Sequence, residues 1–356
     1  MRIRGRARIS RAAGNRMPAA HSIPGAMSKN LSLCAVAVVV GGCALEELEE
    51  LEEHGTISSF ILPVSDCDDP LVCPGNSDLM GVLGPYELDA TGTTDSQRGF
   101  RIIGMTHGGQ TVTALDVGGA SVRVTRAAGI FTGPGVLGLT LRLRHSKGRE
   151  FDLVIDDYLT SKVPYYAGGS PDIDGYHVSY TEVGTHDTRN LCPYATAVDD
   201  GFVGTWAVFW KGDRFDPDTG QIFASGAGVG SWFNLSCAGE APIKMLRART
   251  GGAVAPLSPV DQRQATLNMF TASYCGPGGK RYTELGQAIA WSDLSGPSQM
   301  GAASVEAIWD EDGAVCLDEP RLFDLDEIAC GNPIPKCTAA EVGQWQLSGW
   351  LLSGNP

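Results

Sequence analysis

Residues 258–279 read SPVDQRQATLNMFTASYCGPGG and contain the clearest helix signal in the chain. Ser258 suits the N-cap, because its hydroxyl can accept a hydrogen bond from an orphan backbone N–H of the first turn. Pro259 suits the first helical position, where the N–H that proline lacks would have no partner. Four apolar side chains at near-helical spacing predict one buried face, formed by Val260, Leu267, Phe270 and Tyr274. Gly276 and the proline after it stop the pattern. The stretch therefore predicts a core helix that delivers Cys275 to a glycine-rich turn.

Short alternating segments dominate the rest of the chain. Residues 137–145 alternate leucine with polar side chains, and residues 150–158 do the same after a Lys147-Gly148 turn. This pattern predicts a β-hairpin with one solvated face. Further strands are predicted at residues 121–125, 176–180, 205–211, 280–291 and 304–309, and a short helix at residues 241–247. The fold class expected is mainly β, a sandwich or distorted barrel with one or two packed helices, tied by disulfides.

The charges are distributed unevenly along the chain. Residues 1–42 contain seven Lys and Arg and no acidic residue, which leaves 20 basic and 41 acidic residues, a net charge of −21, in the remainder. A surface of that sign repels nucleic acid and anionic lipid headgroups. We therefore expect no nucleic-acid partner, and we interpret the acidity as a means of keeping an exported protein soluble.

Residues 27–43, MSKNLSLCAVAVVVGGC, have the form of a bacterial export signal. Val40, Gly41, Gly42 and Cys43 resemble a lipobox, which implies diacylation of Cys43 and removal of everything before it. The apolar run is too short to span a bilayer. The Arg-rich residues 1–26 then either extend the signal or precede a true start at Met27. A plain secretory signal without lipid is the alternative.

The sequence suggests five regions. They are a signal region (residues 1–42), a lipid-anchored acidic tether (43–54) that includes ALEELEELEE, an N-terminal β-rich region (55–175), a second domain (176–340) and a C-terminal segment (341–356). The expected location is the cell envelope, at the outer membrane or cell surface through the lipid anchor. Without the anchor, the protein would be periplasmic or secreted.

Eight cysteines remain after Cys34 in the signal and Cys43 at the lipidation site. They are Cys67, Cys73, Cys192, Cys237, Cys275, Cys316, Cys330 and Cys337. An even number in an exported chain predicts four disulfides. Short spacing suggests two local pairs, and the other four cysteines allow three connectivities, of which one is favoured. The predicted pairs are Cys67–Cys73, Cys330–Cys337, Cys192–Cys237 and Cys275–Cys316.

Zinc binding and thiol catalysis are the other uses of cysteine. The chain has no closely paired C-x₂₋₄-C ligands of the zinc type. A thiolate at Cys275 would face the negative end of the helix dipole, which raises its pKa and makes it a poor nucleophile. Disulfide formation is therefore the favoured interpretation.

The end of the helix also carries a family resemblance. Ala272, Ser273, Tyr274 and Cys275 resemble the Ala-Asp-Tyr-Cys signature of the ADYC-domain family of exported bacterial proteins, with Ser273 in place of the aspartate. Four blocks around it agree in order: WAVFWKGDRF (206–215), FNLSCAGEAPIKM (233–245), YTELGQAIAW (282–291) and EAIWDEDGAVCLDEPR (306–321). The likeness extends over about residues 178–337. It implies export and names no activity.

Catalytic motifs are weak by comparison. The sequence contains neither G-x-S-x-G nor H-E-x-x-H. A hydrolase could still be assembled from Asp156, Asp157, Glu182, His177 and His186, which would then converge in one pocket. Surface or structural roles are the favoured interpretation for the histidines, namely His54, His107, His145, His177 and His186.

Two further ligand classes come from local patterns. Asp172 and Asp174 resemble the first half of a calcium loop, as do Asp310 and Asp312, but neither pair is followed by the spaced glutamate that such loops use. Because Asp-Gly is also a turn signal, calcium is a minor expectation and no other cofactor is predicted. Five aromatic residues either line a glycan-binding face or fill a β core: Trp206, Phe209, Trp210, Trp232 and Trp291.

The leading hypothesis is a lipid-anchored envelope protein whose β-rich domain binds a protein or glycan partner rather than catalysing a reaction. An exported hydrolase that uses Asp, Glu or His side chains is the alternative.

Overall fold

The computed structural model describes residues 87–160, 173–192, 206–216, 218–238, 240–249, 258–283, 289–293 and 304–355. Several sequence predictions concern residues outside these ranges. They are the signal, the lipidation at Cys43, the acidic tether, the Cys67–Cys73 pair and the Asp172 ligand.

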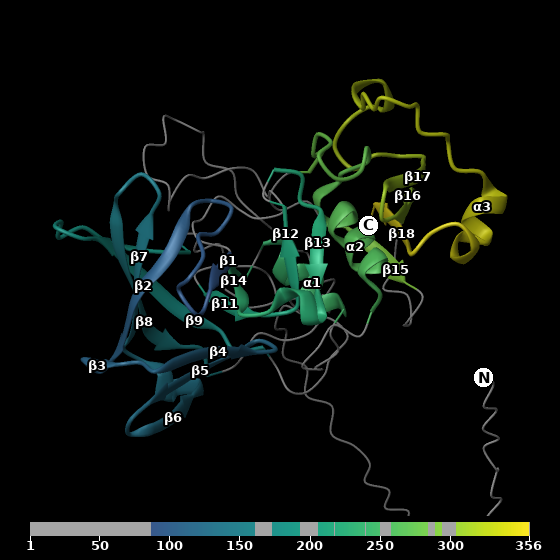
Figure 1. The fold of residues 1–356 in the computed structure, drawn as a ribbon. Coiled ribbons are helices and arrows are strands. Elements are labelled where there is room, and N and C mark those ends of the chain that lie inside the picture. The colour runs from purple at the N-terminus through teal and green to yellow at the C-terminus, as the bar shows by residue number, and fades with distance from the viewer. Residues whose placement is uncertain are drawn as a thin grey trace, which may run out of the picture. The chain divides into compact units, whose positions relative to one another are not determined.

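The described residues are mainly β, in antiparallel sheets, as predicted (Figure 1). The largest sheet has nine strands. Its order is β1 (Glu87–Asp89), β14 (Trp232–Cys237), β11 (Ala207–Trp210), β9 (Tyr176–Glu182), β8 (Glu150–Tyr158), β7 (Leu139–His145), β2 (Phe100–His107) and β3 (Gln110–Thr111), with β10 (Thr188–Asn190) paired to β9.

Three smaller sheets complete the strands. The first has the order β4 (Ala114–Gly118), β5 (Ser121–Arg126), β6 (Gly129–Thr132). The second pairs β12 (Asp213–Phe215) with β13 (Ile222–Ser225). The third has the order β15 (Ala290–Asp293), β18 (Leu351–Asn355), β16 (Ser304–Asp310), β17 (Gly313–Leu317). The C-terminal segment therefore supplies an inner strand of a sheet.

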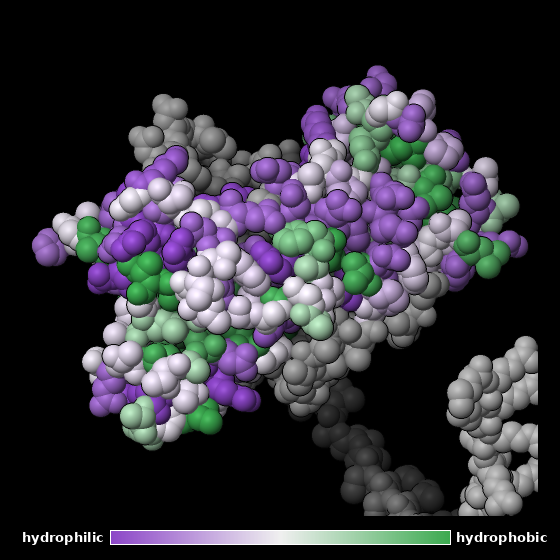
Figure 2. Space-filling view, in the orientation of Figure 1, coloured by the Kyte–Doolittle hydropathy of each residue, from purple (hydrophilic) through white to green (hydrophobic). Residues whose placement is uncertain are grey.

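Helices are few. The α-helices are α1 (Ala241–Arg249), α2 (Val260–Thr271) and α3 (Ala339–Gly343), and the 3₁₀ turns are η1 (Gly133–Val136), η2 (Gly226–Val229), η3 (Leu325–Glu327) and η4 (Trp345–Leu347). No helix among the described residues has the length and apolar character needed to cross a membrane. On the face shown in Figure 2, hydrophobic residues form small separate groups within a mostly hydrophilic surface.

The predicted hairpin is β7–β8. Leu141 lies opposite Leu153 and Leu143 opposite Phe151, and all four side chains are buried. On the other face, the Arg142 guanidinium donates to the Asp152 carboxylate, with an Nη2–Oδ2 distance of 2.8 Å. Alternation was therefore a reliable guide here, because one face of the sheet packs on the core and the other carries cross-strand ion pairs.

Strand β11 separates two cores. Its four residues are all buried: Ala207 and Phe209 pack with the interior of the large sheet, whereas Val208 and Trp210 pack with α1, α2 and the third sheet. A strand covered on both faces has no polar alternation. This explains why residues 206–210 read as a continuous apolar run.

Helix α2 differs from its prediction at its start and in its buried face. Pro259, not Ser258, is the N-cap, and the helix begins at Val260. Every residue from Gln262 to Thr271 is buried, whereas Val260, expected on the buried face, is 37 % exposed. The helix is surrounded by protein, so its polar side chains form internal hydrogen bonds: Asn268 Nδ2, for example, donates to the carbonyls of Asp310 and Glu311 at 3.2 and 3.0 Å. Tertiary partners, which a local pattern cannot show, decide which face is buried.

The helix also ends earlier than the glycine pattern suggested. Ala272, not Gly276, is the left-handed C-cap, with φ 48° and ψ 43°. Among the described residues of the strand predicted at 280–291, Ala290 and Trp291 are in β15, whereas residues 280–283 have no strand structure.

Candidate functional site

The tyrosine of the family-like signature lies in the core. Tyr274 follows the αL cap of α2, and its side chain is buried. Its hydroxyl donates to Glu306 Oε1 at 2.5 Å, and the backbone N–H of Arg321 donates to the Tyr274 oxygen at 3.4 Å. Burial raises the pKa of Tyr274, and the Glu306 carboxylate raises it further. The phenol is therefore held neutral, as a hydrogen-bond donor rather than an acid or nucleophile.

Glu306 and Arg321 form a fully buried ion pair. The guanidinium contacts both carboxylate oxygens, with Nε–Oε1 at 2.7 Å and Nη2–Oε2 at 2.8 Å, and the two side chains are 0 % and 1 % exposed. Arg321 Nη2 also donates to the Met269 carbonyl of α2 at 2.8 Å. Such a pair is stable only when other groups also use its hydrogen-bonding capacity. Here the Tyr274 hydroxyl and the Met269 carbonyl supply further partners.

The network continues into β18. Ser353 Oγ donates to Glu306 Oε2 at 2.7 Å, and Trp309 Nε1 donates to the same Ser353 oxygen at 2.7 Å. The Tyr274 ring is stacked on Trp309, with centroids 5.3 Å apart and 21° between the planes. The signature therefore joins α2, β16 and β18 through one buried network.

The signature cysteine is in a disulfide. Cys275 pairs with Cys330, Cys316 pairs with Cys337, and Cys192 pairs with Cys237. The Cys192–Cys237 pair agrees with the sequence prediction. The predicted Cys275–Cys316 and Cys330–Cys337 pairs are wrong: the hydrogen bond from Leu317 N to the Pro335 carbonyl, 2.9 Å, brings the neighbouring cysteines 316 and 337 together instead.

The glycine that follows the signature is required by close backbone packing. Gly276 has φ +81°, and a Cβ added there would meet the Asp312 carbonyl oxygen at 2.1 Å. From the other side, a Cβ on Gly313 would meet the Tyr274 carbonyl oxygen at 2.6 Å. The turn after α2 is thus pressed directly against the β16–β17 turn, where the Ala314 N–H donates to the Tyr274 carbonyl at 2.9 Å.

A second buried ion pair joins α2 to β12. The Arg263 guanidinium donates to both oxygens of Asp213, Nε to Oδ2 at 2.7 Å and Nη2 to Oδ1 at 2.6 Å. It also donates from Nη2 to Ser225 Oγ at 2.7 Å. The strongest charge interactions around the signature are consequently internal and contribute to the fold rather than to an open site.

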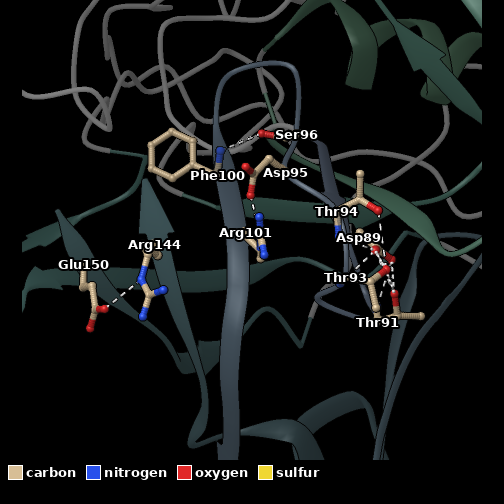
Figure 3. Close-up of polar contacts among 10 residues, drawn as sticks. All are labelled: Asp89, Thr91, Thr93, Thr94, Asp95, Ser96, Phe100, Arg101, Arg144 and Glu150. Atoms are coloured by element: carbon tan, nitrogen blue, oxygen red, sulfur yellow. Dashed lines mark hydrogen bonds and ion pairs between the residues drawn. The ribbon is translucent and has the colours of Figure 1, made fainter. Parts of the chain in front are cut away.

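A third carboxylate, Asp89, organises the turn after β1 (Figure 3). It accepts backbone N–H groups from Thr91, Thr93 and Thr94 at 3.0–3.1 Å and the hydroxyls of Thr91, Thr93 and Ser231 at 2.6–2.8 Å. Although burial alone would raise the pKa of Asp89, these donors hold it well below its ordinary value. The charged carboxylate thus fixes the loop between β1 and β2.

Asp89→Asn is expected to lower the free energy of unfolding by about 2 kcal/mol near pH 7, because an amide cannot accept all these donors. The stabilisation by the depressed carboxylate is present above the unfolded-state pKa and is lost as pH falls through the folded-state pKa. The difference between wild type and variant should therefore shrink below about pH 4. Urea unfolding near pH 7 and near pH 3 measures both quantities.

Asp95→Asn is the matched control, since Asp95 lies in the same loop and makes an exposed ion pair with Arg101 at 2.6 Å (Figure 3). It should cost less than about 1 kcal/mol. An equal loss from both substitutions, or a loss from Asp89→Asn that does not change with pH, would contradict the assigned role.

A cavity of about 400 Å³ opens next to this loop. Its lining includes residues 114–117 of β4 and also Thr91, Ser231 and Phe233. Lys211 and Asp116 also line it, so the cavity contains one cation and one anion together with hydroxyl groups. Its volume lies within the range of small-ligand sites.

Of the proposed acid–base residues, the described structure brings Asp156 and His177 together. Asp156 Oδ1 is hydrogen-bonded to His177 Nδ1 on the neighbouring strand. Glu182 instead accepts two hydrogen bonds from Arg149 at 2.8 and 2.6 Å, and this guanidinium lowers the pKa of Glu182. Asp157 accepts from the Tyr158 N–H at 2.7 Å, and His186 is exposed between β9 and β10.

The described calcium candidates have other partners. Asp174 is buried and accepts the hydroxyls of Ser121, Tyr158 and Tyr176 at 2.6, 2.8 and 3.2 Å. Residues 310–313 form the turn between β16 and β17, where Asp310 Oδ1 accepts the Asp312 N–H at 2.9 Å. In the part of the chain that the structure describes, no three His, Cys, Asp or Glu side chains are grouped so that they could hold a metal ion.

The five aromatic candidates do not share a face. Phe209 lies in the core of the large sheet, whereas Trp210 and Trp291 lie in the core around α2. Trp206 and Trp232 are half-buried, and the Arg214 guanidinium lies 4.0 Å from the Trp232 ring centroid. They pack the fold, which is the commoner role of such residues in a β protein.

Two of the remaining described histidines have structural roles. His107 Nε2 lies 3.0 Å from the Leu137 carbonyl. His145 Nδ1 accepts the Lys147 N–H at 3.2 Å, and burial lowers the pKa of His145.

The sequence did not single out the charges that matter most. Glu306 and Arg321 are the first and last residues of the family-like block 306–321, which was the one available signal. Ser353 lies beyond that block, and the Arg263–Asp213 pair joins residues 50 positions apart. Neither spacing nor composition indicates such partners.

The comparison with family models agrees with the resemblance carried by the signature. The family model of the ADYC domain matches residues 133–323, which is more than half of the chain and begins upstream of the segment on which the sequence resemblance was based. No curated protein and no solved structure matches. The match includes Tyr274, Cys275, Glu306 and Arg321. The chain therefore belongs to the ADYC domain family.

Proposed function

We propose that the protein is a lipid-anchored binding protein of the cell envelope. The three disulfides between described cysteines indicate an extracytoplasmic protein. The lipobox resemblance at Cys43 supports the anchor, and the acidic residues after it supply a tether. These observations support the location of the protein. The proposed binding activity depends on a different feature, the cavity beside β4.

The observation that carries the binding activity is a pair of unengaged charges in that cavity. Within the described residues, neither the Lys211 ammonium nor the Asp116 carboxylate makes an ion pair or a side-chain hydrogen bond. Arg123 lies opposite Asp116 in the β4–β5 register but forms no ion pair with it. In contrast, the charges around the signature and in the Asp89 loop are satisfied internally. Unpaired polar groups that converge in a concavity are the usual mark of a ligand site.

One observation favours the hydrolase as a second candidate. The Asp156–His177 contact has the form of the carboxylate–imidazole half of a catalytic triad. The ring is half-exposed and lies edge-on to Trp206, with centroids 6.3 Å apart. Among the described residues, however, no serine, threonine or cysteine side chain is hydrogen-bonded to the imidazole, so the nucleophile of such a triad is missing from this arrangement.

Intact mass of the protein from the membrane fraction tests the location. We expect a diacyl increment on a chain that begins at Cys43, and thiols that alkylate only after reduction. A chain without lipid would remove the anchor, and a free thiol at any of the six paired cysteines in the unreduced protein would contradict the pairing.

Thermal unfolding with a defined set of amino acids, short peptides and mono- and disaccharides tests the binding activity. A ligand should raise Tm of the wild type, and Lys211→Met or Asp116→Asn should remove that shift. His177→Ala should leave it unchanged. If no compound raises Tm, or if the shift survives both cavity substitutions, the binding site is not this cavity. Hydrolysis of ester or peptide substrates that is lost in His177→Ala would favour the hydrolase.

A further inference from the structure

We infer that the free edge of β4 accepts a short extended peptide as an added strand; this inference rests on the proposed binding function and names its ligand. The first observation is that β4 is an edge strand, since in the described structure it pairs only with β5. Antiparallel neighbours use half of each other's backbone groups. The other half of the β4 groups must point away from β5.

The hairpin geometry identifies which groups these are. β4 and β5 are joined by two residues, the first of which is Gly119 with φ +65°, and Gly118 lies opposite Ser121. In a two-residue hairpin the flanking pair is hydrogen-bonded, and hydrogen-bonded pairs then alternate along the ladder. Gly118, Asp116 and Ala114 therefore bond to β5, whereas the N–H and C=O groups of Leu115 and Val117 face outward.

These outward groups have no partner in the part of the chain that the structure describes. Within the described ranges, neither Leu115 nor Val117 makes a backbone or side-chain hydrogen bond outside the β4–β5 ladder. Their side chains are buried in the core of the large sheet, so β4 is held firmly in place. The strand thus offers two fixed donors and two fixed acceptors, the arrangement that binds an extended chain.

The open edge faces the cavity. Side chains of successive residues in a strand point to opposite faces, so a cavity on one face would touch alternate residues. Here all four residues 114–117 line it, which places the cavity along the strand edge. The cavity is also lined by Phe233 of β14, a strand of the large sheet, and by Ser231, which precedes β14. A strand added to β4 would therefore lie between two sheets.

The length and charge of the occupant follow from the same residues. Leu115 and Val117 are two residues apart, about 7 Å along a strand, so three extended residues match both sets of groups. Lys211 can receive a carboxylate and Asp116 an ammonium group, and both are unpaired. A peptide of three or four residues with free termini, or with one acidic and one basic side chain, fits this cavity of about 400 Å³.

Amide hydrogen exchange of the full processed protein tests the inference directly. The probe is a library of tetrapeptides with free termini, from which native mass spectrometry selects the members retained. With a selected peptide at saturation, exchange at Leu115 and Val117 should slow by at least about tenfold, whereas Asp116, already bonded to β5, should change little. Slow exchange at Leu115 and Val117 without peptide would mean that the edge is already occupied, which overturns the inference.

Two matched variants distinguish the contribution of the Val117 N–H to peptide binding from the contribution of side-chain packing. Val117→Pro removes the outward N–H and leaves the β4–β5 ladder intact, as proline on an edge strand does. Val117→Ala loses the same packing but keeps the N–H. We expect the affinity for the selected peptide to fall about tenfold further in Val117→Pro than in Val117→Ala.

Equal affinity in the two variants, or retention of no tetrapeptide, overturns strand addition. If saccharides or amino acids bind in a Lys211-dependent manner while tetrapeptides do not, the binding function stands and only the peptide inference fails. If nothing binds, both fail.

Discussion

Glu306→Ala is expected to lower the free energy of unfolding by about 3–5 kcal/mol, because it leaves the Arg321 guanidinium buried without a counter-charge. Arg321 cannot turn towards water, since its side chain is 1 % exposed and is held by the Met269 carbonyl. Tyr274 and Ser353 would each lose an acceptor as well. Urea unfolding followed by tryptophan fluorescence measures the loss, because Trp309 lies in the same network.

Two controls make this expectation specific. Tyr274→Phe removes one hydrogen bond and leaves the ion pair in place, so it should cost about 1–2 kcal/mol. Arg144→Ala breaks the pair with Glu150 on the exposed face of β7, where the arginine side chain is 57 % exposed, and should cost less than about 1 kcal/mol. If Glu306→Ala cost no more than Arg144→Ala, the buried network would not be what secures α2 to the third sheet.

The network also explains what the family signature does in this chain. Tyr274 and Cys275 lie at the end of α2, and both engage partners more than 30 residues away. Ser273, which replaces the signature aspartate, is buried, and its N–H caps the helix by donating to the Asn268 carbonyl at 2.8 Å. The signature therefore marks a folding determinant, and the candidate binding site lies elsewhere, beside β4.

Local patterns predicted the parts of the fold that local physics decides. The β7–β8 hairpin could be predicted because one face of those strands is buried and the other is not. The position of helix α2 could be predicted because its start and stop signals are local. Its buried surface could not be predicted, since Gln264 and Asn268 are buried by partners from β13 and the β16–β17 turn. The same limit applies to the cavity, which is lined both by Asp116 of β4 and by Lys211, the residue that follows β11.

The disulfides also differ in whether the local sequence could predict them. The Cys192–Cys237 pair could be predicted, whereas Cys330 and Cys337 are close in sequence and nevertheless have different partners. Sequence separation determines the entropy of closing a loop, but that cost grows slowly with length. Which cysteines meet is set by the strands that carry them, and Cys316 lies on β17, beside the segment that contains Cys337.

A fragment limited to the family-matched residues 133–323 is expected not to fold. It lacks β2, which pairs with β7 along seven residue positions, and it lacks β1, which pairs with β14. It also lacks β18, which lies between β15 and β16 in the third sheet. Without β18, the edges of two strands and the apolar residues packed against Leu351 and Leu352 would be open to water.

Circular dichroism and limited proteolysis, applied both to the fragment and to the full processed chain, test whether the fragment folds. We expect the fragment to show no cooperative unfolding transition and to be cut within the residues of α2 and β16, which the full chain should protect. Deleting residues 351–355 alone should have the same effect on α2, because it removes Ser353 from Glu306 and the inner strand from the sheet. The control is Leu347→Ala, which alters an 83 % exposed side chain before β18 and should leave unfolding unchanged. Cooperative unfolding of the 133–323 fragment would show that the ADYC segment folds without strands from either side of it, and that the buried network does not depend on β18.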